Sequence, residues 1–504
     1  MTAGTVRIRL EPLAIEIDVP SGATLSSVLA QHAVEFPCGG TGLCGGCRVR
    51  VLAGSLSVTD QDRAFFSADD LAHGWRLACQ ARAESPITLE CGQWQMDVLT
   101  DNSALSATGK SGLGIAIDLG TTTIAAQLLD LATGVVLAVE TELNPQASSG
   151  SDVMSRINAV LSGVDLTTPI RSALRQMIAR LAHGREPEIA EVVLVGNTVM
   201  HHLFSGLSVE PLAHAPFESP NFRAQIFSPS CLAWPLPTAC RIRFERCLGG
   251  FVGSDILAGI VATGMARSGQ LTALIDLGTN GDIAMGNRHG IVCASTAAGP
   301  AFEAGSIRMG MRASTGAISS VSLKHGRTHA KVIGDVTPRG ICGSGLVDAV
   351  AAGLATHAIL PSGRIDNAAK LFPVAPPVVL HQSDIRELQL AKAAIAAGFK
   401  LLLRPLGAQV TGLESIHLAG AFGNYVQIPS AIAIGLLDAP PAIIHPAGNT
   451  ALRGAKMLLL AANNPALPSI QHISLATDPN FQDEFANCMT FPSCKEIDLL
   501  RQLG

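Results

Sequence analysis

The fold of most of this chain is decided by the stretch Ile115-Ala-Ile-Asp118-Leu-Gly120-Thr121-Thr122-Thr123-Ile-Ala125, which returns later as Leu274-Ile-Asp276-Leu-Gly278-Thr279-Asn280-Gly281-Asp282-Ile-Ala284. Each copy reads as an apolar strand that ends in an aspartate, a tight turn and a second strand. A second echo relates Val193-Leu-Val-Gly-Asn197 to His417-Leu-Ala-Gly-Ala421, each a strand that runs into a turn of small residues. Such repetition predicts two related halves that face each other.

The turn residues of both copies have the chemistry of a phosphate site. A turn with glycine and threonine exposes backbone N–H groups and hydroxyls to phosphate oxygens. An aspartate at a strand end can hold Mg²⁺, often through water, so Asp118 and Asp276 are the predicted catalytic residues. The predicted nucleotide-binding residues of the two turns are Gly120, Thr121, Thr122, Gly278, Thr279, Asn280 and Gly281. One copy alone could equally be an ordinary hairpin whose aspartate caps a turn.

A third element follows in Leu418-Ala-Gly420-Ala-Phe-Gly423-Asn-Tyr425. Here Gly420 and Gly423 are predicted to let the backbone pack against a base or ribose. The three elements together resemble the phosphate and adenosine motifs of the actin, sugar-kinase and heat-shock-chaperone superfamily. This resemblance implies an α/β, two-lobed, ribonuclease H-like ATPase domain at residues 113–504 that binds ATP and Mg²⁺. Its lobes are expected at about 113–270 and 271–504.

Four cysteines near the N-terminus have the spacing of an iron–sulfur ligand set. Cys38, Cys44 and Cys47 lie in a glycine-rich run, and Cys79 follows from a distant loop. The glycines let the backbone wrap a small inorganic core. A zinc site is the alternative, but zinc sites prefer two Cys-x2-Cys pairs or added histidines, and this sequence has one such pair. We therefore predict a 2Fe–2S cluster on these four cysteines, with Cys91 as a bystander.

The segment around these cysteines resembles a ferredoxin. The alternation of Val6–Leu10 and Ile15–Val19 predicts a β-hairpin, and a short helix is expected around Leu25–Gln31. Because five residues separate the first two cysteines, residues 1–92 resemble the adrenodoxin-like branch of the 2Fe–2S ferredoxins. That resemblance implies an α+β domain of the β-grasp type. The small, polar residues of 93–112 are predicted to form a linker.

Composition narrows the classes of protein that fit. The chain has 504 residues, of which 48% are hydrophobic, enough for several cores. A net charge of −5 without a basic run argues against a nucleic-acid partner. The sequence contains no run of about 18 uncharged apolar residues, so no membrane span is predicted. Its first residues lack the apolar core of a signal peptide. We therefore expect a cytoplasmic protein whose 12 cysteines are not a disulfide framework.

A ferredoxin fused to this kind of ATPase resembles the reductive activators of corrinoid proteins. Further stretches that carry the resemblance are Asn144-Pro-Gln, Asp152-Val-Met-Ser-Arg156, Gly196-Asn-Thr-Val-Met-His-His202, Ser295–Glu303 and Gly340–Gly345. The resemblance implies that one electron passes from the 2Fe–2S cluster to Co(II) of a corrinoid protein or methyltransferase, restoring Co(I), and that ATP drives the step. It also implies an upstream low-potential electron donor, and it leaves a homodimer open. Many members carry an extra segment between ferredoxin and ATPase that this chain lacks, so its dimer contacts are expected to differ.

Other functions fit parts of the sequence. A small-molecule kinase of the same superfamily would phosphorylate a substrate without a reductant, and an iron–sulfur redox sensor would report its cluster state through the ATPase. Activators of radical dehydratases fit less well, because they lack a fused ferredoxin. Asp282 is a secondary candidate for the nucleotide site, and Glu303 is a candidate to line either the nucleotide cleft or the face that meets the partner. His201 and His202 are expected to pack rather than to bind metal, because adjacent residues on a helix point in different directions.

Overall fold

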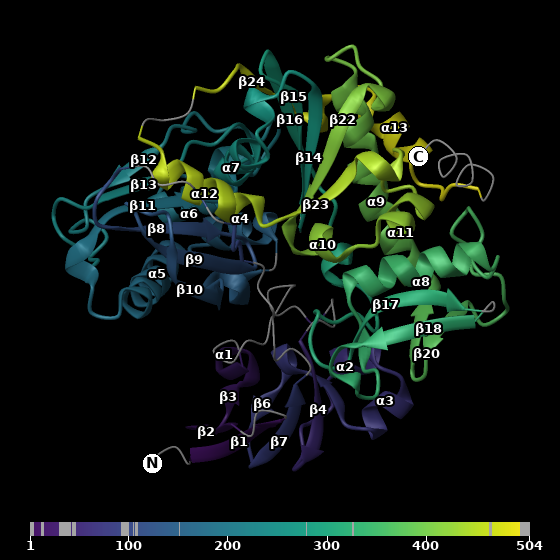
Figure 1. Ribbon diagram of the computed structural model, residues 1–504. Coiled ribbons are helices and arrows are strands. Elements are labelled where there is room, and N and C mark those ends of the chain that lie inside the picture. The colour runs from purple at the N-terminus through teal and green to yellow at the C-terminus, as the bar shows by residue number, and fades with distance from the viewer. Residues whose placement is uncertain are drawn as a thin grey trace.

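The chain contains three bodies, each built on a β-sheet. The computed structural model describes residues 5–11, 15–29, 42, 47–91, 100–103, 105, 109–150, 152–278, 280–324, 327–462 and 466–493. Figure 1 shows the N-terminal body beneath two larger lobes, with the last described helix, α13 (Phe481–Asn487), on the second lobe.

The N-terminal body is a five-stranded sheet in the order β2-β1-β7-β4-β5. Its elements are β1 (Thr5–Glu11), β2 (Ile15–Pro20), β3 (Ala23–Thr24), α1 (Leu25–Leu29), β4 (Arg48–Ala53), α2 (Asp60–Phe65), α3 (Ala68–Ala72), β5 (Trp75–Leu77), β6 (Arg82–Ala83) and β7 (Ile87–Cys91). Strand β1 pairs antiparallel with β2 and parallel with β7. Val6, Ile8 and Leu10 are buried while the residues between them are exposed, as the period of two predicts. The β-grasp fold class is confirmed.

The first lobe has a sheet in the order β10-β9-β8-β11-β13-β12. Its strands are β8 (Leu113–Leu119), β9 (Thr123–Asp130), β10 (Val136–Leu143), β11 (Ile189–Val195), β12 (Gln225–Phe227) and β13 (Arg241–Phe244). Its helices are α4 (Val153–Leu161), α5 (Thr167–Ala182) and α6 (Thr198–Ser205). Strands β8, β9 and β10 form an antiparallel meander, and β11 and β13 join it in parallel on the other side of β8.

The second lobe has a sheet in the order β23-β22-β14-β15-β16-β24. Its strands are β14 (Leu271–Leu277), β15 (Gly281–Asn287), β16 (Gly290–Thr296), β22 (Leu413–Ala419), β23 (Ile444–Gly448) and β24 (Ile470–His472). Its other elements are β17 (Ala317–Lys324), β18 (Arg327–Val332), β19 (Gly340–Ile341), α8 (Gly343–Ala355), β20 (Leu371–Ala375), β21 (Val378–His381), α9 (Gln382–Leu403), α10 (Gly420–Tyr425) and α11 (Ile428–Ala433). An antiparallel meander followed by two parallel strands repeats the plan of the first lobe, so the predicted two-lobed, actin-like fold class is confirmed.

The two lobes also share one close backbone contact at a glycine. A Cβ atom on Gly196, just after β11, would lie 2.6 Å from the carbonyl oxygen of Leu119, just after Asp118. A Cβ atom on Gly420, just after β22, would lie 2.8 Å from the carbonyl oxygen of Leu277, just after Asp276. In both lobes a glycine therefore lets the fourth strand of the plan turn directly against the strand that carries the aspartate.

Two helices cross between the lobes. Helix α7 (Ser254–Thr263) follows β13 of the first lobe, but Ile256 and Ile260 pack against the second sheet. Helix α12 (Thr450–Leu460) follows β23 of the second lobe, but Leu452 and Leu459 pack against the first sheet. The helices touch where Gly454 faces Ala258, and Figure 1 shows both between the two sheets. Each lobe is thus covered by a helix that follows the other lobe's sheet.

The described residues of the predicted linker are attached to helix α12. The ammonium group of Lys456, whose side chain is fully buried, lies 2.5 Å from a carboxylate oxygen of Asp101 and donates to the Asp101 carbonyl at 2.9 Å. The Gln127 amide donates to the same carbonyl at 2.8 Å. Lys110 then donates to the carbonyl of Leu459 at 2.7 Å. Residues 100–103 and 109–112 therefore lie fixed on the first lobe and its crossing helix.

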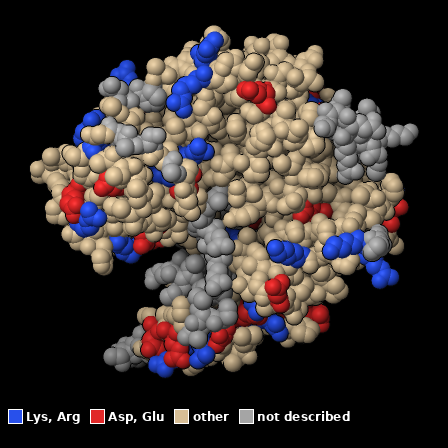
Figure 2. Space-filling model, viewed as in Figure 1, with Lys and Arg blue, Asp and Glu red and all other residues tan. Residues whose placement is uncertain are grey.

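The surface carries charges of both signs. On the face drawn in Figure 2, the basic and acidic side chains of the described residues are intermixed. Among the helices that the structure describes, none is long and apolar enough to cross a membrane.

The helix crossing makes a prediction about stability. A Cβ atom at position 454 would lie 2.0 Å from the carbonyl oxygen of Ala258, so Gly454→Ala forces the two helices apart. Overpacking of this kind costs about 1–3 kcal/mol, which exceeds the roughly 1 kcal/mol that alanine gains over glycine in a helix. We expect a lower midpoint of thermal unfolding by circular dichroism. Gly412→Ala, where a Cβ meets open space, is the control, and an equal midpoint for both variants would contradict the prediction.

Candidate functional site

The two predicted aspartates lie near the ends of equivalent strands, and the charge of Asp118 acts on Asp276. Asp118 is the last residue but one of β8, and its Oδ2 accepts a hydrogen bond of 2.9 Å from the Asn449 amide at the start of α12. Asp276 is likewise the last residue but one of β14. Burial raises the pKa of Asp118 to about 6. Burial, together with the charge of Asp118, raises the pKa of Asp276 to about 7. The two halves of the repeat thus bring their carboxylates into one electrostatic environment.

A third carboxylate belongs to the same group. Asp282 lies directly opposite Asp276 in the β14–β15 hairpin. Among the residues that the structure describes, its Oδ1 atom is buried and has no hydrogen-bond partner. Burial and the neighbouring Asp276 raise its pKa to about 7, although a hydrogen bond from Ser295 opposes the shift. A buried acceptor without a partner is costly, so this oxygen is available to a bound group.

A fourth carboxylate, Asp255, was not predicted. It lies in the first turn of α7, and its Oδ1 accepts a hydrogen bond of 2.8 Å from the backbone N–H of Ile256. Burial raises its pKa well above the usual range, and the charges of Asp282, Asp276 and Asp118 add to the shift. No pattern near residue 255 connects it to either hairpin. The crossing of α7 into the second lobe is what brings it to the site.

These carboxylates suit a hydrated magnesium ion. Their pKa values rise because negative charges are buried together, and a cation would remove that cost. The donors are all oxygens, which Mg²⁺ prefers. No three His, Cys, Asp or Glu side chains in the described part of the chain are placed to ligate one ion directly. Mg²⁺ commonly keeps its waters and binds through one or two carboxylates and substrate phosphates, so a nucleotide would complete its shell.

Buried polar side chains hold the turn after β8. The Asn144 amide donates to the carbonyl of Gly120 at 2.9 Å, and the Asn197 amide donates to Oγ1 of Thr121 at 2.8 Å. The guanidinium of Arg156, which is fully buried, donates to the carbonyl of Thr121. Burial lowers the pKa of Arg156 to about 9. The turn that is predicted to bind phosphate is therefore fixed before any ligand arrives.

The corresponding turn after β14 is only partly described. The backbone N–H of Gly278 donates to the carbonyl of Asn280 at 3.1 Å, and Thr279 lies outside the described residues. A Cβ atom on Gly281 would lie 2.5 Å from the Ile395 side chain, and the Thr296 hydroxyl donates to the Gly281 carbonyl at 2.9 Å. Glycine is required at 281 because helix α9 packs directly against the hairpin.

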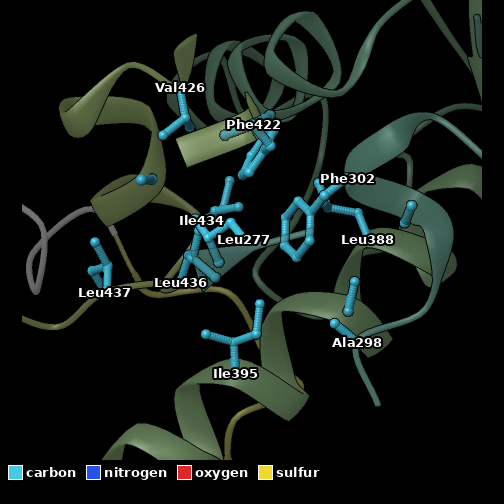
Figure 3. Close-up of a cluster of buried hydrophobic side chains, with 14 of the residues drawn as sticks. Leu277, Ala298, Phe302, Leu388, Ile395, Phe422, Val426, Ile434, Leu436 and Leu437 are labelled. Carbon is cyan, nitrogen blue, oxygen red and sulfur yellow. The ribbon is translucent and has the colours of Figure 1, made fainter. Parts of the chain in front are cut away.

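Helix α10 touches the second aspartate. Gly420 has a φ of +81°, and a Cβ atom there would lie 2.6 Å from Oδ1 of Asp276. At Gly423 the nearest atom to a Cβ would be the carbonyl carbon of Leu418, at 3.2 Å. The Phe422 ring of the same helix packs on the Phe302 ring, with ring centroids 4.6 Å apart. Figure 3 shows both rings in one apolar cluster with Leu277, the residue that follows Asp276.

Two of the four predicted cluster ligands are described. The backbone N–H of Ala78 donates to the carbonyl of Cys47 at 3.0 Å, which joins the segments of Cys47 and Cys79. The Gln80 amide lies 3.5 Å from Sγ of Cys79 and donates to it, as suits a thiolate. Cys38 and Cys44 lie outside the described residues.

Cys91 differs from these ligands. It is buried in the ferredoxin core, and burial raises the pKa of its thiol to about 12. A thiol of this kind stays protonated and is a poor metal ligand, as expected of a bystander.

The two adjacent histidines lie in the core of the first lobe. His202 bonds the carbonyl of Thr198 and the hydroxyl of Ser219, both at 2.8 Å. His201 packs edge-to-face on Phe244. Burial lowers the pKa of both rings. These contacts are those of packed side chains.

Models of known protein families match the ferredoxin domain and both lobes of the chain. Residues 8–84 match the 2Fe-2S iron-sulfur cluster binding domain, residues 113–268 match the RACo middle region, and residues 270–501 match the C-terminal domain of RACo, the ASKHA domain. The corrinoid activation enzyme RamQ of Eubacterium limosum is 36% identical over 413 residues, which cover 74% of this chain and 69% of RamQ. This chain belongs to the RACo family. The predicted resemblance is thereby confirmed.

Two further relatives support membership of the RACo family. The [Co(II) methylated amine-specific corrinoid protein] reductase of Methanosarcina barkeri is 27% identical over 69% of this chain and 70% of its own length. The solved structure of a reductive activator for corrinoid, iron-sulfur protein superposes with a TM-score of 0.66 at 26% identity, over 97% of this chain and 98% of that one. The roles of single residues in this RACo-family site stay predictions.

The carboxylate group makes a prediction about pH. In the nucleotide-free protein, Asp276 keeps its proton at pH values where the unfolded chain has lost it, because its pKa rises from 3.8 to about 7. The folded state then binds more protons than the unfolded state, so stability falls as pH rises through this interval. Asp276→Asn removes one such group. We expect its unfolding midpoint at pH 8 to exceed that of the unsubstituted protein by a few degrees, and the difference to vanish near pH 4.

The control for this prediction is Asp366→Asn, at an exposed site, which should leave the pH profile unchanged. A lower midpoint for Asp276→Asn at pH 8 would show that the carboxylate stabilises the empty site and would contradict the prediction.

The cysteines make a second prediction. Cys79→Ser should lose iron, acid-labile sulfide and visible absorbance, because a cluster needs four thiolates. Cys91→Ser should retain all three, since its thiol is a core group. Zinc in place of iron in the purified protein, or a stable cluster in Cys79→Ser, would refute the ligand assignment.

Proposed function

We propose that this protein is an ATP-dependent reductive activator that passes one electron from a 2Fe–2S cluster to Co(II) of a corrinoid protein or methyltransferase. The product is Co(I), and one electron from a low-potential donor restores the activator. The observation that carries the proposal is a ferredoxin domain in one chain with a paired-aspartate phosphate site. RACo-family membership over both parts supports it.

The ferredoxin domain would hold the electron carrier. Cys38, Cys44, Cys47 and Cys79 are the thiolates that we assign to the cluster, which supplies one-electron transfer when bound. The segments of the described pair, Cys47 and Cys79, are joined by the hydrogen bond from the backbone N–H of Ala78 to the carbonyl of Cys47, and Cys47 is almost fully buried.

The ATPase lobes would supply the driving force. A plant-type cluster has a potential near −400 mV, so a cobalt couple about 100 mV lower costs about 2.3 kcal/mol per electron. Differential binding of a few kcal/mol shifts such an equilibrium strongly. Closure of the two lobes on Mg-ATP would supply this differential binding free energy. The crossing helices α7 and α12, which contact both lobes, would transmit the closure.

Single residues of the site receive distinct roles. Asp118 and Asp276 would hold the hydrated Mg²⁺, and the turns at Gly120–Thr122 and Gly278–Gly281 would bind the phosphates. Asp255 would accept the proton of the attacking water, because a bound Mg²⁺ would offset the charge of the three neighbouring carboxylates and so lower the raised pKa of Asp255. The water oxygen bonds to the terminal phosphorus while the bond to the bridging oxygen breaks.

We also propose a cytoplasmic location, where the described free cysteines stay reduced.

One experiment tests the main proposal. The cluster-loaded protein, a Co(II) corrinoid protein and a reductant are mixed with and without Mg-ATP, and Co(I) absorbance is followed. We expect Co(I) to form faster and further with Mg-ATP. Equal rate and extent without ATP would refute the proposed role of the nucleotide, and a phosphorylated small molecule would indicate a kinase instead.

The role of Asp255 has its own test. Asp255→Asn should lower the rate of phosphate release by about 10²-fold or more while ATP still binds, because general-base catalysis contributes factors of this size. Ser268→Ala, on an exposed turn, is the control. An unchanged hydrolysis rate in Asp255→Asn would remove this residue from the mechanism.

A further inference from the structure

A single arginine of the ferredoxin domain reaches into the second lobe. Arg48 follows the predicted cluster ligand Cys47 and opens strand β4. Its guanidinium donates to the carbonyl of Arg308 and, at 2.5 Å, to the carbonyl of Gly310. Two backbone acceptors from another body therefore hold a side chain that lies next to the cluster loop.

Carboxylates of both bodies surround this arginine. Burial lowers the pKa of Arg48 to about 10, while Asp384 of the second lobe and Asp70 of the ferredoxin domain oppose the shift. Asp384 is fully buried, and its Oδ1 accepts the backbone N–H of Arg308 at 3.0 Å. The guanidinium thus stays charged near pH 7, and its hydrogen bonds are of the stronger, charge-assisted kind.

An ion pair crosses the same interface. Arg339 of the second lobe lies 2.9 Å from Glu90 of β7, and Arg50 lies 3.7 Å from the other oxygen of Glu90. The Arg339 side chain is 39% exposed, so salt screens this pair. An interface that rests on charged contacts can open and close, unlike a large apolar one.

The segment that receives Arg48 is packed continuously onto the nucleotide site. Gly310 bridges to Ile341, which leads into α8. A Cβ atom on Gly343, at the start of α8, would lie 1.7 Å from the carbonyl oxygen of Phe302. Phe302 packs on Phe422 of α10, the helix whose first residue touches Asp276. The contacts between these elements leave no room for one to move alone.

We propose that Arg48 is a latch that holds the cluster-bearing domain on the second lobe, and that nucleotide binding changes the fraction of latched molecules. The second part rests on the proposed function, because it needs ATP at the site beside Asp276. The partner of this surface is the protein's own ferredoxin domain, recognised by one guanidinium on two carbonyls and by one ion pair.

The latch is tested on the full-length, cluster-loaded protein without nucleotide. Arg48→Ala should enlarge the radius of gyration in X-ray scattering. It should also speed hydrogen exchange of the Met311 and Ile341 amides, which donate to the carbonyls of Ile341 and Met309 beside Gly310. Loss of charged hydrogen bonds should shift the ratio of latched to released molecules by about tenfold. Arg339→Ala removes the ion pair with Glu90 from the second lobe's side of the interface and should also enlarge the radius of gyration and speed hydrogen exchange. Raising the salt concentration should release the unsubstituted protein too.

The matched control is Arg82→Ala, since Arg82 is an exposed arginine whose guanidinium donates to the carbonyl of Gly22 in its own domain. An unchanged cluster absorbance shows that Arg48→Ala keeps its cofactor. Equal radii and exchange rates in all variants would overturn the latch.

The nucleotide coupling is measured separately, with saturating Mg-ATP whose binding is verified by calorimetry. A changed radius or exchange rate in the unsubstituted protein, reduced in Arg48→Ala, supports the coupling, and no change overturns it. Failure to form Co(I) would defeat the proposed function and would leave the nucleotide-free latch result standing.

Discussion

The close crossing of helices α7 and α12 is the contact on which the rest of the ATPase depends. Each helix follows one sheet and packs on the other, and they meet where Gly454 faces Ala258. The crossing carries Asp255 and Asn449 to the aspartates at the strand ends. A rotation of one lobe must therefore move the carboxylates and the helices together, since neither helix belongs to one lobe alone.

The predicted nucleotide site gathers buried negative charge, which lowers the stability of the folded chain. Burial and mutual repulsion raise the pKa values of its aspartates, and Asp282 leaves an acceptor atom without a partner among the described residues. Sites that bind cations commonly keep such charges because the ligand removes the cost. The buried Arg156 and the amides of Asn144 and Asn197 stabilise the first turn from behind, so the strain is confined to the carboxylates.

The sequence predicted the features that depend on local pattern. The strand–aspartate–turn repeat, the ferredoxin hairpin and the two-lobed fold follow from periodicity and from glycine at tight turns, and the fold classes and the family are confirmed. Asp255 and Asn449 could not be found in this way, because each reaches the site through a helix that crosses from one lobe to the other. The closest neighbour of Gly420 is the Asp276 carboxylate, a tertiary contact that no local pattern reveals.

The buried pair of Lys456 and Asp101 fixes how far the electron carrier can travel. Strand β7 ends at Cys91, and Asp101 is held on α12, so ten peptide steps separate the end of the ferredoxin sheet from this fixed point. A fully extended chain of that length spans about 35 Å. The end of β7 therefore stays within about 35 Å of Asp101, and this distance limits the part of the ATPase surface at which the cluster can meet an electron acceptor.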